Sequence, residues 1–513
     1  MSGSSNYEKN KRIAGNTVFL FIRMLLMMFI GLFTSRIILQ TLGEHDFGVF
    51  NAVGGVVSFC AVLTGSVSSA ITRFLTFSLG EGDPAKTHRV FSASVIIQLL
   101  MCLVVGLIVE TAGLWWLNSH MSIPPDRLVA ARWVLHCSFG ILCVNLLSVP
   151  YNSMILAHEK MSAYAYISIL ESLLKLSVAI LLMYSSFDKL KTYSLLMLVI
   201  AIIVRITYGI YCKRHFDESR GRIVVDKGII KEMSGFVGWN FFSSGFGVMA
   251  NSGTNLLINK YFGVLVNAAR GLTTQVEGTV RPFAVNFLSA LNPRLTKSYA
   301  EGDKKYVFDL VHKGVKISFL LLLLIVTPLF LECDYLLDLW LKDVPEYTST
   351  FVRISLLCIL ADIGMNSPRQ LIIASGRIKS FCVMAGIMNL CAFVAVWVIY
   401  ALGGTPESSY IVFLVTQIII DVLCLLICKW QEGFPILDFI RKVLIRLALV
   451  AVFAFLAGYG VRVMIPAGFL RLVAVTASTT LVIGLLSYFY ALTKGERDFI
   501  EEIFYKIIRR ARK

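Results

Sequence analysis

Polar and ionisable side chains follow helix faces within stretches that are otherwise apolar. In residues 264–291 they recur at alternating steps of three and four, which places on one helix face the residues Asn267, Arg270, Thr274, Glu277 and Arg281. Residues 235–259 carry a second stripe, made of Asn240, Ser244, Gly247, Asn251 and Asn255. Residues 162–184 carry a third, made of Tyr164, Ser168, Glu171 and Lys175. Because ionisable groups are costly in apolar surroundings unless they pair or face water, the stripes predict a water-filled cavity.

Arginine and asparagine are the side chains here that indicate a ligand. Arg23 follows Arg12 by 11 residues, or roughly 17 Å along a helix, which is too deep for its head group to reach the surface easily. The guanidinium fork matches phosphate oxygens, and amides suit sugar hydroxyls. We therefore predict a substrate with an anionic phosphate and a hydrogen-bonding head. The predicted substrate-binding residues are Arg23, Arg270, Arg281, Glu277, Lys175, Asn251, Asn255 and Asn240.

Three acidic residues within apolar stretches of the sequence have more than one interpretation. Glu277 and Arg281 are four residues apart, as are Glu171 and Lys175. Each pair can form a local ion pair that only stabilises packing. Asp362, within the apolar run 349–374, either binds a proton or a cation or pairs with a base of the same half of the chain.

The elements that must position these residues are membrane-spanning helices. Of the 513 residues, 57% are hydrophobic and only 16% are charged, against about a quarter charged in soluble domains. A run of about 20 apolar residues is long enough to cross the hydrocarbon layer. The sequence predicts an all-α polytopic membrane protein with about fourteen transmembrane helices. The predicted spans are 13–40, 47–72, 90–115, 128–156, 162–184, 190–212, 235–259, 264–291, 309–332, 349–374, 379–402, 408–428, 440–462 and 468–492.

The distribution of bases predicts the orientation. The net charge is +16, but most bases lie in every second loop, so nucleic acid is not an expected partner. Under the positive-inside rule both termini face the cytoplasm, which requires an even number of spans. The eleven cysteines lie mostly in apolar runs without the spacing of a metal site, and no metal or cofactor is expected.

The sequence Glu-Gly-Asp occurs twice, at 81–83 and 301–303, and the same offset of 220 residues places Gly43 on Gly263. These matches predict two six-helix lobes related by an internal repeat, with two additional C-terminal helices. Lobes of this kind enclose a central cavity and rock to give alternating access. The glycine and the aspartate are predicted to end one helix and start the next. The predicted parts are an N-lobe at 1–212, a cytoplasmic linker at 213–234, a C-lobe at 235–430, helices 13 and 14 at 431–492, and a basic amphipathic cytoplasmic tail at 493–513.

Five runs, spread over both halves of the chain, are similar to one transporter family. They are RIAGNTVFLFIRMLLMM at 12–28, LGEHDFGVFNAVGGVV at 42–57, SSAITRFLTFSLGEGD at 68–83, VNAARG at 266–271 and NPRLTKSYAEGD at 292–303. They resemble the polysaccharide-biosynthesis (O-antigen type) flippases of the multidrug/oligosaccharidyl-lipid/polysaccharide exporter superfamily. The resemblance covers nearly the whole chain and implies two six-helix lobes plus two helices.

The resemblance also implies a function. Members move undecaprenyl-diphosphate-linked oligosaccharides to the outer leaflet of the bacterial cytoplasmic membrane, so the partners to expect are this lipid-linked glycan, membrane lipids and other polysaccharide-assembly proteins. In the related lipid II flippases, basic residues of the first and eighth helices hold the diphosphate. Arg23, Arg270 and Arg281 fit that role by helix and depth.

Two other transporter functions stay open, a lipid II flippase and a cation-coupled multidrug exporter. The exporter is disfavoured because the span 13–40 has an arginine at its centre and no acid. A membrane enzyme is not expected. Such an enzyme needs a sizeable outer loop, whereas the loop at 333–348 is short and has no histidine or basic cluster.

Overall fold

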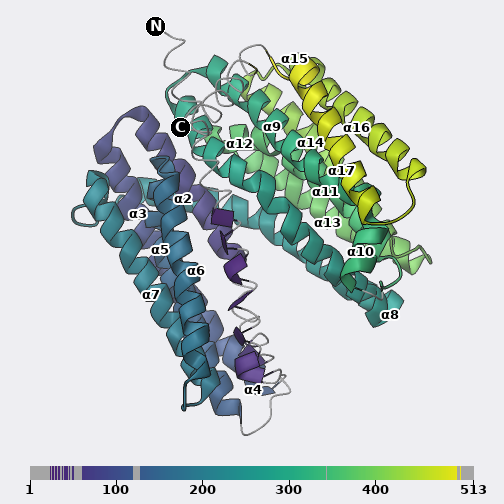
Figure 1. The fold of residues 1–513 in the computed structure, drawn as a ribbon. Helices are drawn as coiled ribbons and strands as arrows, with labels where there is room; N and C mark the ends of the chain where they lie inside the picture. Colours follow the sequence, from purple (N-terminus) through teal and green to yellow (C-terminus); the bar gives the residue numbers. More distant parts are fainter. Residues whose placement is uncertain are drawn as a thin grey trace, which may run out of the picture. The chain divides into compact units, whose positions relative to one another are not determined.

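The computed structural model describes residues 61–119, 127–341 and 344–493, Arg497, and part of the segment from Arg23 to Val53. Each regular element among these residues is a helix (Figure 1). Ten of the described helices are long and apolar enough to cross a membrane. The predicted all-α polytopic class is therefore confirmed. The amphipathic tail predicted at 493–513 lies, apart from Thr493 and Arg497, outside the described residues.

In the first half, the predicted spans 128–156, 162–184 and 190–212 agree with helices to within a few residues, whereas the helix predicted to end at 72 ends at Glu81 and the one predicted to begin at 90 begins at Pro84. Between Arg23 and Val53 the described residues are helical. The elements that follow are α2 (Ala61–Glu81), α3 (Pro84–Ile108), the π-helical turn η1 (Val109–Gly113), α4 (Leu114–Ser119), α5 (Leu128–Ala157), α6 (Met161–Met183), α7 (Lys189–His215) and the 3-10 turn η3 (Asp217–Ser219).

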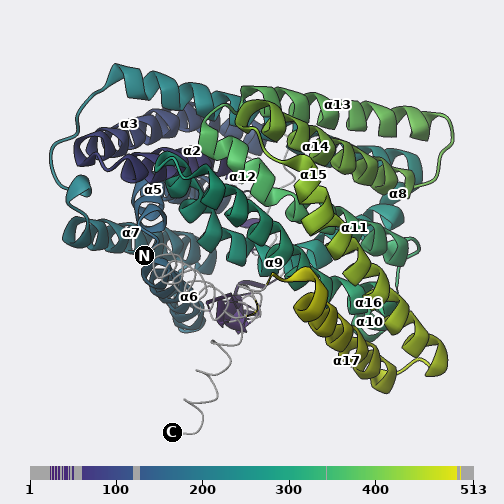
Figure 2. The same cartoon turned by 90° about the horizontal axis from the view of Figure 1, so that it is seen from above.

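The second half of the chain begins with α8, which consists of two helical parts, and ends with a helical hairpin. Its elements are α8 (Lys227–Ala300), α9 (Lys304–Leu331), α10 (Cys333–Leu341), α11 (Thr348–Gly364), α12 (Asn366–Ser375), α13 (Lys379–Ala401), α14 (Ser408–Glu432), α15 (Ile436–Phe439), the π-helical turn η4 (Ile440–Leu444), α16 (Ile445–Met464), α17 (Phe469–Leu486) and the π-helical turn η5 (Ser487–Ala491). The last long helices, α16 and α17, pack against each other as an antiparallel pair (Figures 1 and 2).

The helix α8 contains two predicted spans that meet at Gly263. This residue has φ +84° and ψ −175°, which is not helical. In a straight helix Asn251 and Arg270 would lie roughly 28 Å apart, since each residue adds 1.5 Å. Their side chains are instead hydrogen-bonded at 3.1 Å, so the chain reverses at Gly263. Gly43, its repeat partner, also has a positive φ of +78°.

Both Glu-Gly-Asp sequences form the predicted helix-to-helix turns. α2 ends at Glu81, Gly82 has φ +75°, and the side chain of Asp83 accepts a hydrogen bond from the backbone N–H of Lys86 in the first turn of α3. In the second copy α8 ends at Ala300, Gly302 has φ +81°, and α9 begins at Lys304. Glycine adopts this left-handed conformation without the steric cost that a Cβ brings. The local prediction is confirmed in both copies.

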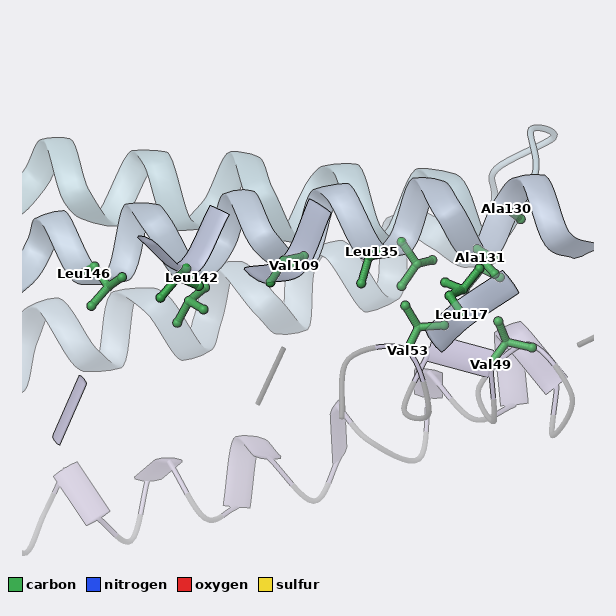
Figure 3. Packing of buried hydrophobic residues seen from close by; sticks show 12 residues of the cluster. Val49, Val53, Val109, Leu117, Ala130, Ala131, Leu135, Leu142 and Leu146 are labelled. Atoms are coloured by element: carbon green, nitrogen blue, oxygen red, sulfur yellow. The ribbon is translucent and has the colours of Figure 1, made fainter. Parts of the chain in front are cut away.

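The described chain folds into two compact units, each built from segments that are distant in sequence. The first comprises residues 1–245, 289–304 and 373–382, and the second comprises residues 246–288, 305–372 and 383–513. The lobe boundaries predicted from the sequence stay predictions. In the first unit, Ala131 of α5 and Leu117 of α4 gather with Val49 and Val53 in one buried cluster (Figure 3). Lipid tails are as apolar as these side chains, so within a membrane the cluster contributes close packing.

Ion pairs hold the hairpin of α16 and α17 to the rest of the second unit. Arg471, in the first turn of α17, donates two hydrogen bonds to Oε2 of Glu332, at 2.8 and 3.0 Å. Glu332 lies between α9 and α10, and its side chain is completely buried. Arg462, near the end of α16, lies 3.6 Å from Asp334, which also accepts a 2.6 Å hydrogen bond from Arg353 of α11.

Replacing Arg471 tests this attachment. Arg471→Ala is expected to lower the free energy of unfolding by about 3–5 kcal/mol, because it leaves the buried carboxylate of Glu332 without its partner. Denaturant unfolding of the purified protein in detergent measures the change. Lys442→Ala is the control, because its pair with Asp438 is exposed and exposed ion pairs contribute little to stability. Equal small losses in both variants would contradict the account.

Candidate functional site

Arg270 connects the part of α8 after Gly263 to the part before it by hydrogen bonds. Its Nη2 donates to the backbone oxygen and to the side-chain oxygen of Asn251, each at 3.1 Å. The guanidinium carbon also lies 5.7 Å from the centre of the Tyr410 ring, on α14. Arg270 is only 6% exposed, so it must leave Asn251 before it can hold a ligand. Its predicted role in substrate binding stays a prediction beside this structural one.

Arg281 begins a chain of four charged side chains in the second unit. Its Nη1 donates a 2.6 Å hydrogen bond to Oδ2 of Asp362, on α11. The other oxygen of Asp362 accepts a 3.0 Å hydrogen bond from Nη1 of Arg369, on α12. Nη2 of Arg369 lies 3.8 Å from Oδ1 of Asp421, on α14, and that oxygen also accepts a bond from Gln417. Guanidinium and carboxylate groups therefore alternate along the chain.

Among these four charged side chains, exposure is greatest at the Arg281 end. The side chain of Arg281 is 46% exposed, whereas those of Asp362 and Arg369 are 21% and 23% exposed. Asp421, at the far end, is only 7% exposed. The most exposed of the four groups is therefore a cation, and both carboxylates are less exposed.

The structure decides between the alternatives for the acidic residues. Lys175 forms the local pair with Glu171, at 2.6 Å, and its role in substrate binding stays a prediction. Arg281 pairs with Asp362 on another helix instead of forming the alternative local pair with Glu277. Asp362 pairs with bases of its own half of the chain, as one interpretation predicted.

The remaining predicted residues are spread over both units. In the first unit the guanidinium of Arg23 lies 4.6 Å from the centre of the Tyr164 ring, on α6. The arginine predicted to lie deep within its span therefore contacts an aromatic side chain. Asn240 belongs to the first unit and Asn255 to the second, and Asn255 is exposed. Within the second unit the structure brings Arg270 to Asn251, and it joins Arg281 to residues outside the predicted set.

The sequence analysis missed Arg369 and Asp421. A signal for Arg369 was present, because it follows Asp362 by seven residues, which is two helical turns and the same face. Asp421 gave a weaker signal, as a single acid within a span. In the described part of the chain, no three His, Cys, Asp or Glu side chains gather as metal ligands would.

Comparison with solved structures identifies the fold. A MATE protein in the bent conformation superposes with a TM-score of 0.71 at 12% identity, covering 82% of this chain and 95% of that one. The chain has the MATE transporter fold. An outward-facing multidrug resistance MATE family transporter of the MOP superfamily gives 0.69 at 14% identity, covering 82% and 96%.

A third structure and one sequence relative add to this comparison. A MOP superfamily transporter from Pyrococcus furiosus, described as having a binding pocket of reverse polarity, gives a TM-score of 0.67 at 13% identity, covering 82% and 96%. The uncharacterized membrane protein EpsK of Bacillus subtilis (strain 168) is 22% identical over 313 residues. The match covers 58% of this chain and only 59% of EpsK. No family model matches the sequence.

Two variants separate the structural role of Arg270 from its predicted role as a ligand. Arg270→Ala is expected to lower the free energy of unfolding by about 1.5–3 kcal/mol, the range for hydrogen bonds to a charged group. Asn251→Ala removes only one of the two acceptors and is expected to cost less. Denaturant unfolding of both variants in detergent measures the difference. Unchanged stability in Arg270→Ala would contradict the fastening role.

Proposed function

We propose that the protein flips an undecaprenyl-diphosphate-linked oligosaccharide, a repeat unit of O-antigen, capsule or exopolysaccharide, from the inner to the outer leaflet by alternating access. The observation that carries this proposal is the open, cationic end of the charge chain at Arg281. A guanidinium that binds a carboxylate can present the same N–H groups to a phosphate. A cationic drug would instead need an exposed carboxylate, and both Asp362 and Asp421 lie behind arginines.

The double pairing of Asp362 explains how a phosphate can displace it. Asp362 bonds to Arg281 through one oxygen and to Arg369 through the other. When a diphosphate binds Arg281, Asp362 still has its hydrogen bond to Arg369. The carboxylate is therefore not left as an unpaired buried charge, which would be strongly unfavourable. Arg281 can thus change partners at a modest cost, and the rest of the charge chain stays in place.

The other predicted residues fit the same substrate. Asn251 and Asn255, on the second unit, offer amide donors and acceptors to a glycan. The positive-inside rule predicts that both termini lie in the cytoplasm, and the resemblance to the flippases implies the bacterial inner membrane. A lipid II flippase is the nearest alternative because its substrate carries the same diphosphate. The multidrug resistance transporter among the similar structures keeps a cation-coupled drug exporter as the second alternative.

Two variants of the charge chain test the sign of the ligand. In lipid nanodiscs, Arg281→Ala is expected to weaken the binding of undecaprenyl diphosphate about tenfold or more, because bonds to a charged group are lost. Asp362→Asn is expected to tighten it, because the competing carboxylate is gone. Native mass spectrometry with titrated lipid measures both affinities. Asp362→Asn should not tighten the binding of a cationic drug such as ethidium.

Arg205→Ala is the matched control. Arg205 also lies within a span, but its guanidinium stacks 3.8 Å from the Tyr151 ring of its own half of the chain. It should bind the lipid like the parent protein. Unchanged lipid binding in Arg281→Ala would reject the site. Saturable ethidium binding that weakens in Asp362→Asn would favour the drug exporter.

A further inference from the structure

Two buried arginines lie about two helical turns before the two Glu-Gly-Asp turns. Arg73 lies near the end of α2 and Arg294 near the end of α8, and each is only 7% exposed. Both belong to the first compact unit, which includes residues 289–304 and 373–382 of the second half. By the predicted orientation, these helix ends lie on the cytoplasmic side. The mechanism proposed above does not use either arginine.

Arg73 of the first half docks on a turn of the second half. Its Nη2 donates a 3.2 Å hydrogen bond to the backbone oxygen of Ala374, in the last turn of α12. Its guanidinium also lies 4.6 Å from the ring of Phe74 and 4.8 Å from that of Phe77. Gly376, which has φ +78°, passes so close to the guanidinium that an added Cβ would collide with it.

Arg294 of the second half docks on a turn of the first half. Its Nη1 lies 3.8 Å from Oε1 of Glu159, in the turn between α5 and α6, and its Nη2 lies 3.9 Å from Oε2 of Glu301. Glu159 also has a positive φ, of 56°, and it precedes Gly376 by 217 residues, close to the offset of the repeat. Each half thus holds the equivalent turn of the other.

The backbones of α2 and α8 come close together at this place. A Cβ on Gly80 would lie 2.6 Å from Cβ of Ala300 and 2.7 Å from the backbone oxygen of Lys297. The side chains around this crossing are small, polar and buried, and they match across the repeat: Thr76, Ser78, Thr296 and Ser298. Small residues let helices in a membrane approach closely. These small side chains therefore allow α2 and α8 to pack closely at the crossing.

We propose that Arg73 and Arg294, here called the arginine clasp, close the cytoplasmic entrance and part together when it opens. The contacts that hold it closed include a hydrogen bond to a carbonyl and ion pairs at 3.8–3.9 Å. At the predicted cytoplasmic surface, a released guanidinium finds water or lipid phosphate. Each arginine joins one half of the chain to a turn of the other half, so a movement that separates the halves breaks both contacts. This inference does not depend on which substrate is carried.

Hydrogen–deuterium exchange tests whether the clasp opens as one unit. The full chain in lipid nanodiscs, without substrate, is followed by mass spectrometry of peptides that cover residues 73–83 and 294–304. Arg294→Ala is expected to speed exchange about tenfold in both segments, because losing its ion pairs favours the open state. Arg294→Lys keeps the charge, and at these distances it should stay within severalfold of the parent. Arg205→Ala should exchange like the parent in both segments.

The coupling between the segments decides the outcome. Faster exchange in residues 73–83 after a change at Arg294 supports the clasp. Faster exchange confined to residues 294–304, or no change in either segment, would overturn it. If Arg294→Ala does not fold, Glu159→Gln replaces it and should speed exchange severalfold in both segments. Because no substrate is present, failure here leaves the proposed flippase function untouched, and failure of lipid binding leaves the clasp untouched.

Discussion

A guanidinium inside an apolar helix bundle must find its partner within the protein, and much of the described structure follows from this constraint. The partners differ in kind. Arg23 and Arg205 lie against the tyrosine rings of Tyr164 and Tyr151. Arg270 bonds to an asparagine, and Arg281 bonds to a carboxylate. The kind of partner and the exposure together determine which arginine is held as part of the framework and which can change partners.

Two sets of arginine contacts serve two different steps of transport in this account. At Arg281 a carboxylate with a second partner can be displaced, so a ligand enters without leaving a bare charge. At the arginine clasp the contacts connect distant parts of the chain, which is the basis for the proposed closure of the cytoplasmic entrance. Both sets use arginine because its planar fork can bond to a carboxylate, a carbonyl or a phosphate in turn.

The sequence predicted what depends on neighbouring residues. Apolar length gave the spans, and Gly82 and Gly302 gave the turns, because only local backbone geometry is involved. The polar stripe on residues 264–291 was also local. The partner of Arg281 could not be predicted from neighbouring residues. Glu277 and Asp362 are both possible partners, and the packing of α8 on α11 determines which of them Arg281 binds. Arg369, Asp421 and the clasp were missed for the same reason, since each acquires its role from a contact distant in sequence.

The most direct test of the proposed flippase function is leaflet transfer by the parent protein in proteoliposomes. A fluorescent undecaprenyl-diphosphate oligosaccharide is placed in both leaflets, and a membrane-impermeant reductant quenches the outer one. Transfer predicts that nearly all the fluorescence is quenched in vesicles that contain the protein, against about half in empty vesicles. Quenching that stops at half, together with saturable transport of a cationic dye by the same vesicles, would contradict the account.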